Sequence, residues 1–182
     1  MNDEFHQSKR YLVGFSYKTH FFARAIRWFT KSEFSHSYVV QQGPQGNYVL
    51  EATSRGVNLQ WYPCFVNDGA LGITEFQVDH VQSTMDEAWG KICTNRLNRP
   101  YSYMQILGDA FVITMQTLFK VSLPNPFSQR KADVCSELVL GWLRRAKISG
   151  FEGLNAGTVS PEDLVLIIRG NKQFTLIDQP PE

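Results

Sequence analysis

The chain lacks a long apolar run, an excess of charge of one sign and a cysteine-rich framework. Its 182 residues carry 18 Lys and Arg against 17 Asp and Glu, a formal net charge of +1, so no global field attracts nucleic acid or an acidic membrane. The most apolar stretch, 106–124, contains Asp109, Gln116 and Lys120, and it falls short of the roughly 20 predominantly apolar residues of a membrane-spanning helix. We therefore expect a small or neutral substrate, no nucleic acid partner and no transmembrane segment.

The amino terminus and the cysteines indicate a reducing compartment. Residues 1–16 lack the apolar core of a signal peptide, so we expect no export by that route. The three cysteines, Cys64, Cys93 and Cys135, are odd in number and have no metal-like spacing, which argues against a disulfide framework or a zinc site. We expect reduced thiols in the cytoplasm, with no metal and no cofactor.

The overall pattern mixes strands and helices. With 43% apolar and 19% charged residues, the chain has the composition of a globular protein, and its length suits one domain over residues 1–182. An α+β fold with an antiparallel sheet is predicted. Strands are expected at 11–16, 57–63 and 71–79, helices at 19–32, 83–98, 103–119 and 134–146, and a capping turn at 160–163 before a last apolar run.

A β-hairpin is the strongest local signal, with two β-rich runs around the turn residues 43–46. If Gly43 pairs with Gly46, the numbers of opposed residues sum to 89, and Tyr38 faces Glu51. The period of two then puts His36 on the same face. His36 and Glu51 become diagonal neighbours, about 7–8 Å apart, so the carboxylate can orient the imidazole. The alternative is a surface Glu beside a partly buried His.

Cys135 opens an apolar periodicity that predicts a helix. Asp133 is the expected N-cap, which puts Cys135 at the second helical position. The free N–H groups and the dipole at a helix start favour a thiolate and can also hold an oxyanion. The alternative is that Cys135 is a small core residue. In the catalytic interpretation, the polar face of the hairpin packs against the start of this helix.

Five segments in order, "FSHSYVV", "YVLEATSRGV", "RPYSYMQIL", "VCSELVLGWL" and "VSPEDL", resemble the circularly permuted papain-like amidases, the YiiX/YaeF-like branch of the NlpC-type cysteine peptidase superfamily. The resemblance implies a permuted papain-like fold in which an antiparallel sheet packs against helices that include the nucleophile helix. It also implies Cys135 as nucleophile, His36 as base and Glu51 as the residue that orients His36. It places Tyr101 beside the active site. We also expect Tyr38, Arg55 and Tyr103 near the substrate, although Tyr38 stands where many members of that family have a small residue, which predicts a narrower pocket.

The resemblance implies a cysteine peptidase or amidase that cleaves a peptidoglycan-type peptide or a related small amide. One alternative is a thioester or lipid acyltransferase or an esterase, which an apolar lining from the 103–119 helix would favour. That helix is also a candidate lid or partner surface, with core packing as the simpler interpretation. The other alternative is a non-catalytic structural or binding module, for instance in a bacteriophage particle, so the expected location is the cytoplasm or a virion.

Overall fold

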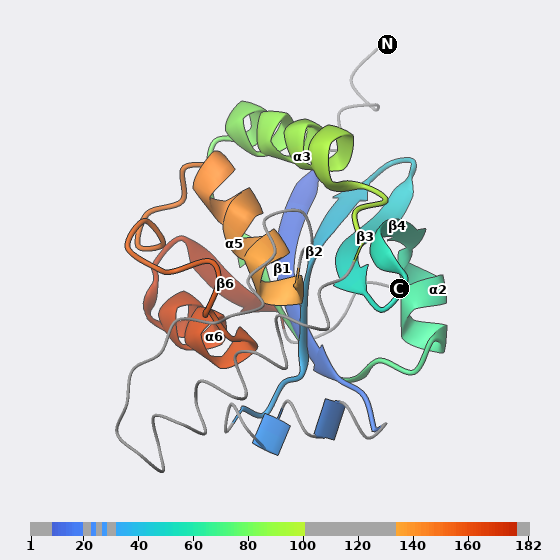
Figure 1. Cartoon of the computed structure of the whole chain (residues 1–182). Helices are drawn as coiled ribbons and strands as arrows, with labels where there is room; N and C mark the ends of the chain where they lie inside the picture. Colours follow the sequence, from blue (N-terminus) through green and yellow to red (C-terminus); the bar gives the residue numbers. More distant parts are fainter. Residues whose placement is uncertain (1–8, 20–22, 25–26, 29–31, 101–133, 178–182) are drawn as a thin grey trace.

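The computed structural model describes residues 9–19, 23–24, 27–28, 32–100 and 134–177 (Figure 1). The strands are β1 (Arg10–Tyr17), β2 (His36–Gly43), β3 (Gly46–Thr53), β4 (Gly56–Trp61), β5 (Leu71–Val78) and β6 (Phe174–Ile177). The helices are α2 (Tyr62–Asn67), α3 (Gln82–Arg96), α5 (Cys135–Arg145) and α6 (Pro161–Gly170). The strands form one antiparallel sheet of order β4-β3-β2-β1-β5-β6. The predicted α+β fold is confirmed; one domain over 1–182 stays a prediction.

The predicted register of the β2–β3 hairpin is confirmed. Tyr38 pairs with Glu51, Val40 with Val49 and Gly43 with Gly46. Gly46 has a φ of +118°, a conformation that side-chain-bearing residues rarely adopt, and so it closes the short turn without strain. The turn thus determines which side chains of the hairpin share a face.

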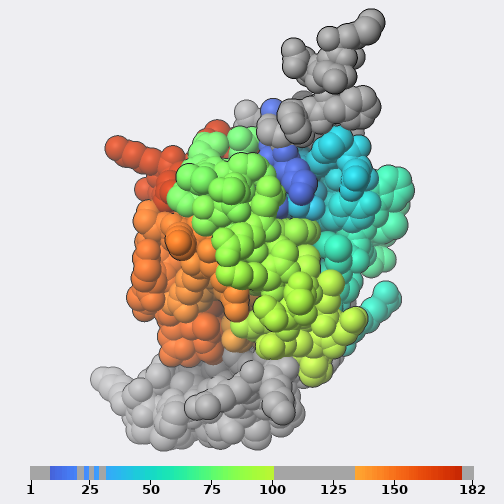
Figure 2. Space-filling view, turned by 90° about the horizontal axis from the view of Figure 1, so that it is seen from above, coloured from blue at the N-terminus to red at the C-terminus, as the bar shows by residue number. Residues whose placement is uncertain are grey.

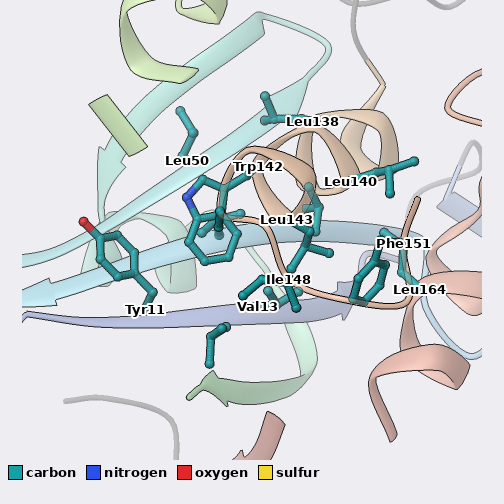
Figure 3. Packing of buried hydrophobic residues seen from close by; sticks show 14 of the residues in the cluster. Tyr11, Val13, Leu50, Leu138, Leu140, Trp142, Leu143, Ile148, Phe151 and Leu164 are labelled. Atoms are coloured by element: carbon teal, nitrogen blue, oxygen red, sulfur yellow. The ribbon is translucent and has the colours of Figure 1, made fainter. Parts of the chain in front are cut away.

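The sheet is buried on both faces by different helices. On one face lies the larger of two hydrophobic cores, which includes Val39 of β2, Leu50 of β3 and Trp142 of α5. Figure 3 shows this core at close range. The helices that contribute to this core are α3, α5 and α6. Figure 2 looks down on α3, which forms the surface between the carboxyl-terminal elements and the hairpin. On the other face, residues of β1, β2 and β3 pack with Tyr62 and Phe65 of α2.

This layering bears on the expected contact between the hairpin and the helix that Cys135 begins. As predicted, His36 on the polar face of the hairpin meets the first residue of α5, whereas the body of α5 covers the opposite, apolar face of the sheet. The apolar stripe of α5, which includes Leu138 and Trp142, packs in the core of that apolar face. Cys135 reaches His36 only because each is the first residue of its element.

Several boundaries differ from the sequence prediction. The strand expected at 57–63 ends at Trp61, and α2 begins at Tyr62 with Pro63 in its first turn, where the fixed φ of proline suits a helix start. The short strand β6 was not predicted. Of the helix expected at 19–32, residues 23–24 and 27–28 are helical, and the 103–119 helix lies outside the described residues. No helix in the described part of the chain is both long enough and apolar enough to cross a bilayer.

The turn predicted at 160–163 is a capping box at the start of α6. The Ser160 hydroxyl accepts a hydrogen bond from the Asp163 backbone N–H at 3.2 Å, and the Asp163 carboxylate accepts one from the Ser160 backbone N–H at 2.8 Å. Replacing Ser160 by Ala should lower the free energy of unfolding by about 1 kcal/mol, since it removes one cap acceptor. Urea melts measure the change. Ser83→Ala is the matched control, because Ser83 is exposed and α3 has no side-chain cap; an equal loss there would contradict the capping effect.

Candidate active site

Cys135 is the first residue of α5, one position nearer the helix start than predicted. The N-cap is Val134, in an extended conformation (φ −103°, ψ 159°) and without a side-chain cap hydrogen bond. Its carbonyl accepts the first helical bond, from the N–H of Leu138 at 3.0 Å. The prediction of Asp133 as cap was therefore wrong, and Asp133 itself lies outside the described residues. The helix start still favours an anion at Cys135 through its free N–H groups.

The Cys135 side chain is buried in contact with His36. Only 6% of Cys135 is exposed. Burial alone raises the pKa of the thiol, but a hydrogen bond with His36, the charge of His36 and the backbone N–H of Ser37 outweigh it and lower the pKa. These contacts favour the thiolate, the form of cysteine that reacts as a nucleophile.

His36 connects the thiol to a carboxylate. Its Nε2 lies 2.7 Å from Oε2 of Glu51, and so Nδ1 is the nitrogen left for Cys135. Burial lowers the pKa of the imidazole, but the hydrogen bonds with Cys135 and Glu51 and the negative charges of both groups raise it overall. The pair therefore favours a thiolate beside an imidazolium.

Glu51 is held on its other side by a residue that the sequence analysis missed. Gln60 of β4 donates from Nε2 to Oε1 of Glu51 at 2.6 Å. Burial raises the pKa of the Glu51 carboxyl, but the hydrogen bond and charge of His36 lower it overall. The turn between β3 and β4 could have identified Gln60 from the sequence. Gly56 pairs with Thr53 across this turn, and the same register pairs Gln60 with Val49. Gln60 is therefore the diagonal neighbour of Glu51 on the same face of the sheet.

The residues expected near a substrate lie in different places. Tyr38 has no exposed surface, and its hydroxyl donates to Glu75 at 2.9 Å. A direct contact between Tyr38 and a substrate is therefore not available. Arg55 lies in the exposed turn between β3 and β4. Tyr101 and Tyr103 lie outside the described residues.

The other two cysteines lie in different surroundings. Cys64 is exposed on α2, and Cys93 is half-buried in α3. Burial raises the pKa of Cys93 to about 11, so its thiol stays protonated near neutral pH. All three thiols are free. Cys135 thus differs from both in having a hydrogen bond with an imidazole.

The comparisons with known proteins bear on the fold. The chain is similar to the crystal structure of the metalloprotein yiiX from Escherichia coli O157:H7, with a TM-score of 0.53 over 97% of this chain and 99% of that chain. This chain has a yiiX-like fold. The sequence identity of 16% means that the likeness shows the fold alone, and the narrower assignment to the NlpC-type superfamily stays a prediction. No protein-family model and no curated protein matches the chain.

Proposed function

We propose that this chain is a cysteine hydrolase that cleaves an amide bond through an acyl-enzyme, with Cys135 as nucleophile, His36 as base and Glu51 as the residue that orients His36. The supporting observation is that His36 makes hydrogen bonds with Cys135 and Glu51 at the same time. A nucleophile, a base and a group that orients the base are the parts of a catalytic triad for acyl transfer.

In the first half of the reaction, the Cys135 thiolate attacks the carbonyl carbon and the C=O electron pair moves onto oxygen. The backbone N–H of Cys135, at the start of α5, donates to that oxyanion. When the C=O bond re-forms, the C–N bond breaks, and the His36 imidazolium gives its proton to the leaving amine. The products of this half are a free amine and a thioester on Cys135.

In the second half, water hydrolyses the thioester. Neutral His36 takes a proton from the water as the oxygen attacks, and the thiolate then leaves, so that a carboxylic acid is released and the thiolate–imidazolium pair returns. Glu51 balances the positive charge on His36 in both halves and holds its Nε2–H. It does not itself need to gain a proton.

No step runs through a metal, although yiiX is described as a metalloprotein. Among the described residues, no group of three or more His, Cys, Asp or Glu side chains could hold a metal ion. In particular, the Glu51 oxygens already accept from His36 and Gln60. The described residues therefore do not fit a metal site.

The substrate class follows from the family resemblance: a peptidoglycan-type peptide or a related small amide. The test is to incubate the full chain with peptidoglycan fragments and acyl esters, beside Cys135→Ala and Cys64→Ala. Intact mass spectrometry should detect an acyl adduct in the wild type and in Cys64→Ala, and none in Cys135→Ala. Amine release should follow the same order.

Other outcomes identify the alternatives. An adduct that passes its acyl group to a lipid or an amine and not to water would indicate an acyltransferase. No adduct with any substrate, together with an ordinary, slowly reacting Cys135 thiol at neutral pH, would contradict the proposal and favour a non-catalytic module.

A further inference from the structure

A buried carboxylate lies on the same face of the sheet as the proposed site. Glu75 of β5 pairs with Gly14 of β1, Gly14 pairs with Tyr38 of β2, and Tyr38 pairs with Glu51 of β3. Directly paired residues of a sheet point to the same face, and so does a residue two positions along the same strand. Glu75, Tyr38, Glu51 and His36 therefore share the face that α2 covers.

Gly14 allows Tyr38 to lie across strand β1. A Cβ at position 14 would come within 2.2 Å of Cε2 and 2.3 Å of Cζ of the Tyr38 ring. Because glycine has no side chain, the ring occupies this space, and its hydroxyl reaches Glu75 on the far side of β1 at 2.9 Å. The contact joins two strands that are not neighbours in the sheet.

Glu75 is a buried acid that the proposed reaction does not use. It is 2% exposed, and its Oε1 accepts from the hydroxyls of Tyr38 and Tyr62, the latter at 3.0 Å. Oε2 has no hydrogen-bond partner in the part of the chain that the structure describes. Burial raises the pKa of this carboxyl and the two tyrosine hydrogen bonds lower it; burial is the larger effect, so the pKa is raised to about 7. An acid buried at such a cost needs a compensating role.

The Tyr38 ring connects this acid to the proposed base. The rings of Tyr38 and His36 are stacked, with centroids 6.0 Å apart and 27° between their planes. Phe65 of α2 contacts Tyr38 with a centroid distance of 4.4 Å. Tyr38 is thus held by Phe65 at its ring and by Glu75 at its hydroxyl.

We propose that Glu75 and Tyr38 are positioning residues: Glu75 anchors the Tyr38 hydroxyl, and the Tyr38 ring fixes the plane of the His36 imidazole against Cys135. The inference rests on the proposed function, in which His36 is the base. It gives Tyr38 a role behind the base in place of the substrate contact that we expected from the sequence. It also explains why an acid is retained in an apolar layer.

The test is the pH dependence of Cys135 alkylation by iodoacetamide, followed by peptide mapping in the full chain. Tyr38→Phe and Glu75→Met should raise the midpoint of the Cys135 titration and lower the alkylation rate near neutral pH roughly threefold, since a less ordered imidazole stabilises the thiolate less. Glu75→Gln should keep the wild-type profile, because an amide oxygen still accepts from Tyr38.

Tyr62→Phe is the matched control. It removes a hydroxyl from the same Glu75 oxygen at nearly the same distance, but the ring of Tyr62 contacts Phe65, and within the described residues no ring contact joins Tyr62 to His36. Every variant keeps the charged groups around His36. These groups are Cys135 of α5 and Glu51 of β3, and Lys18 acts on Glu51. Melting curves establish that each variant is folded.

Each outcome decides between the inferences. Profiles of Tyr38→Phe and Glu75→Met that match the wild type would overturn the positioning role and leave the proposed function intact. If Tyr62→Phe shifted the Cys135 titration as much as Tyr38→Phe does, the positioning role would also be overturned. The shift would then follow from the loss of either tyrosine hydroxyl and not from the stacking of Tyr38 on His36. An ordinary thiol titration of Cys135 in the wild type would overturn the proposed function and the inference together.

Discussion

Replacing Cys135 by Ser should reduce kcat for the amide substrate by about 10³-fold or more. The serine hydroxyl stays protonated near neutral pH, whereas the contacts of Cys135 with His36 and the Ser37 backbone lower the pKa of the thiol. The variant therefore loses the charged nucleophile, while the backbone conformation and the volume of the side chain at the site stay nearly the same. Steady-state assays of the purified, folded variant measure the loss.

The other two cysteines provide matched controls. Cys93→Ser and Cys64→Ser should keep turnover near the wild-type value, because Cys93 has a raised pKa inside α3 and Cys64 lies exposed on α2. The opposite pattern, in which Cys93→Ser is inactive and Cys135→Ser is active, would show that the nucleophile is assigned to the wrong residue.

His36→Ala should reduce kcat to a similar degree as Cys135→Ser, by about 10³-fold. Glu51→Gln should reduce kcat less, by roughly tenfold to a hundredfold. His36 transfers the proton itself, whereas Glu51 acts only through the imidazole. The neutral amide that Glu51→Gln introduces still accepts from Nε2–H, so the orientation is partly kept, while the charge that balances the imidazolium is lost.

The pH–rate profile separates these roles. Glu51 raises the pKa of His36 by its hydrogen bond and charge, so Glu51→Gln should lower that pKa. The alkaline limb of the profile, where His36 loses its proton, should move to lower pH. Glu87→Gln, which removes an exposed carboxylate that pairs with Lys91 on α3, is the control and should leave the limb in place. An unmoved limb and a wild-type rate in Glu51→Gln would show that Glu51 does not act on the base.

Local patterns predicted the parts of this protein that depend on neighbours in sequence. The glycines at 43 and 46 specify a short turn, and the turn determines the pairing of Tyr38 with Glu51. The cap-like turn predicted at 160–163 marks the start of α6, where Ser160 and Asp163 form a capping box. The His36–Glu51 contact at 2.7 Å is a consequence of the first of these patterns, because the period of a strand places both side chains on one face.

Other local predictions failed where two local signals compete. Trp61 and Tyr62 continue an apolar run that is typical of a strand, but Pro63 suits a helix start, and the chain changes from β4 to α2 between them. At α5, the expected cap was one residue too early. Val134 accepts the first helical hydrogen bond although valine is a poor capping residue, because the packing of α5 on the sheet, and not its cap, determines where the helix begins.

By itself, the sequence determined the hairpin, its register and the amphipathic helix that Cys135 begins. Only the tertiary structure decided that α5 covers the apolar face of the sheet while α2 covers the face with Glu51 and Tyr38, and that Cys135 meets His36 where their two elements begin. The contact of Tyr38 with Glu75 also depends on the tertiary structure, because it requires β1 to lie between β2 and β5 in the sheet. The physical reason is range: turns and caps are set by residues a few positions apart, whereas the order of strands and the face that each helix covers depend on burial of the whole chain.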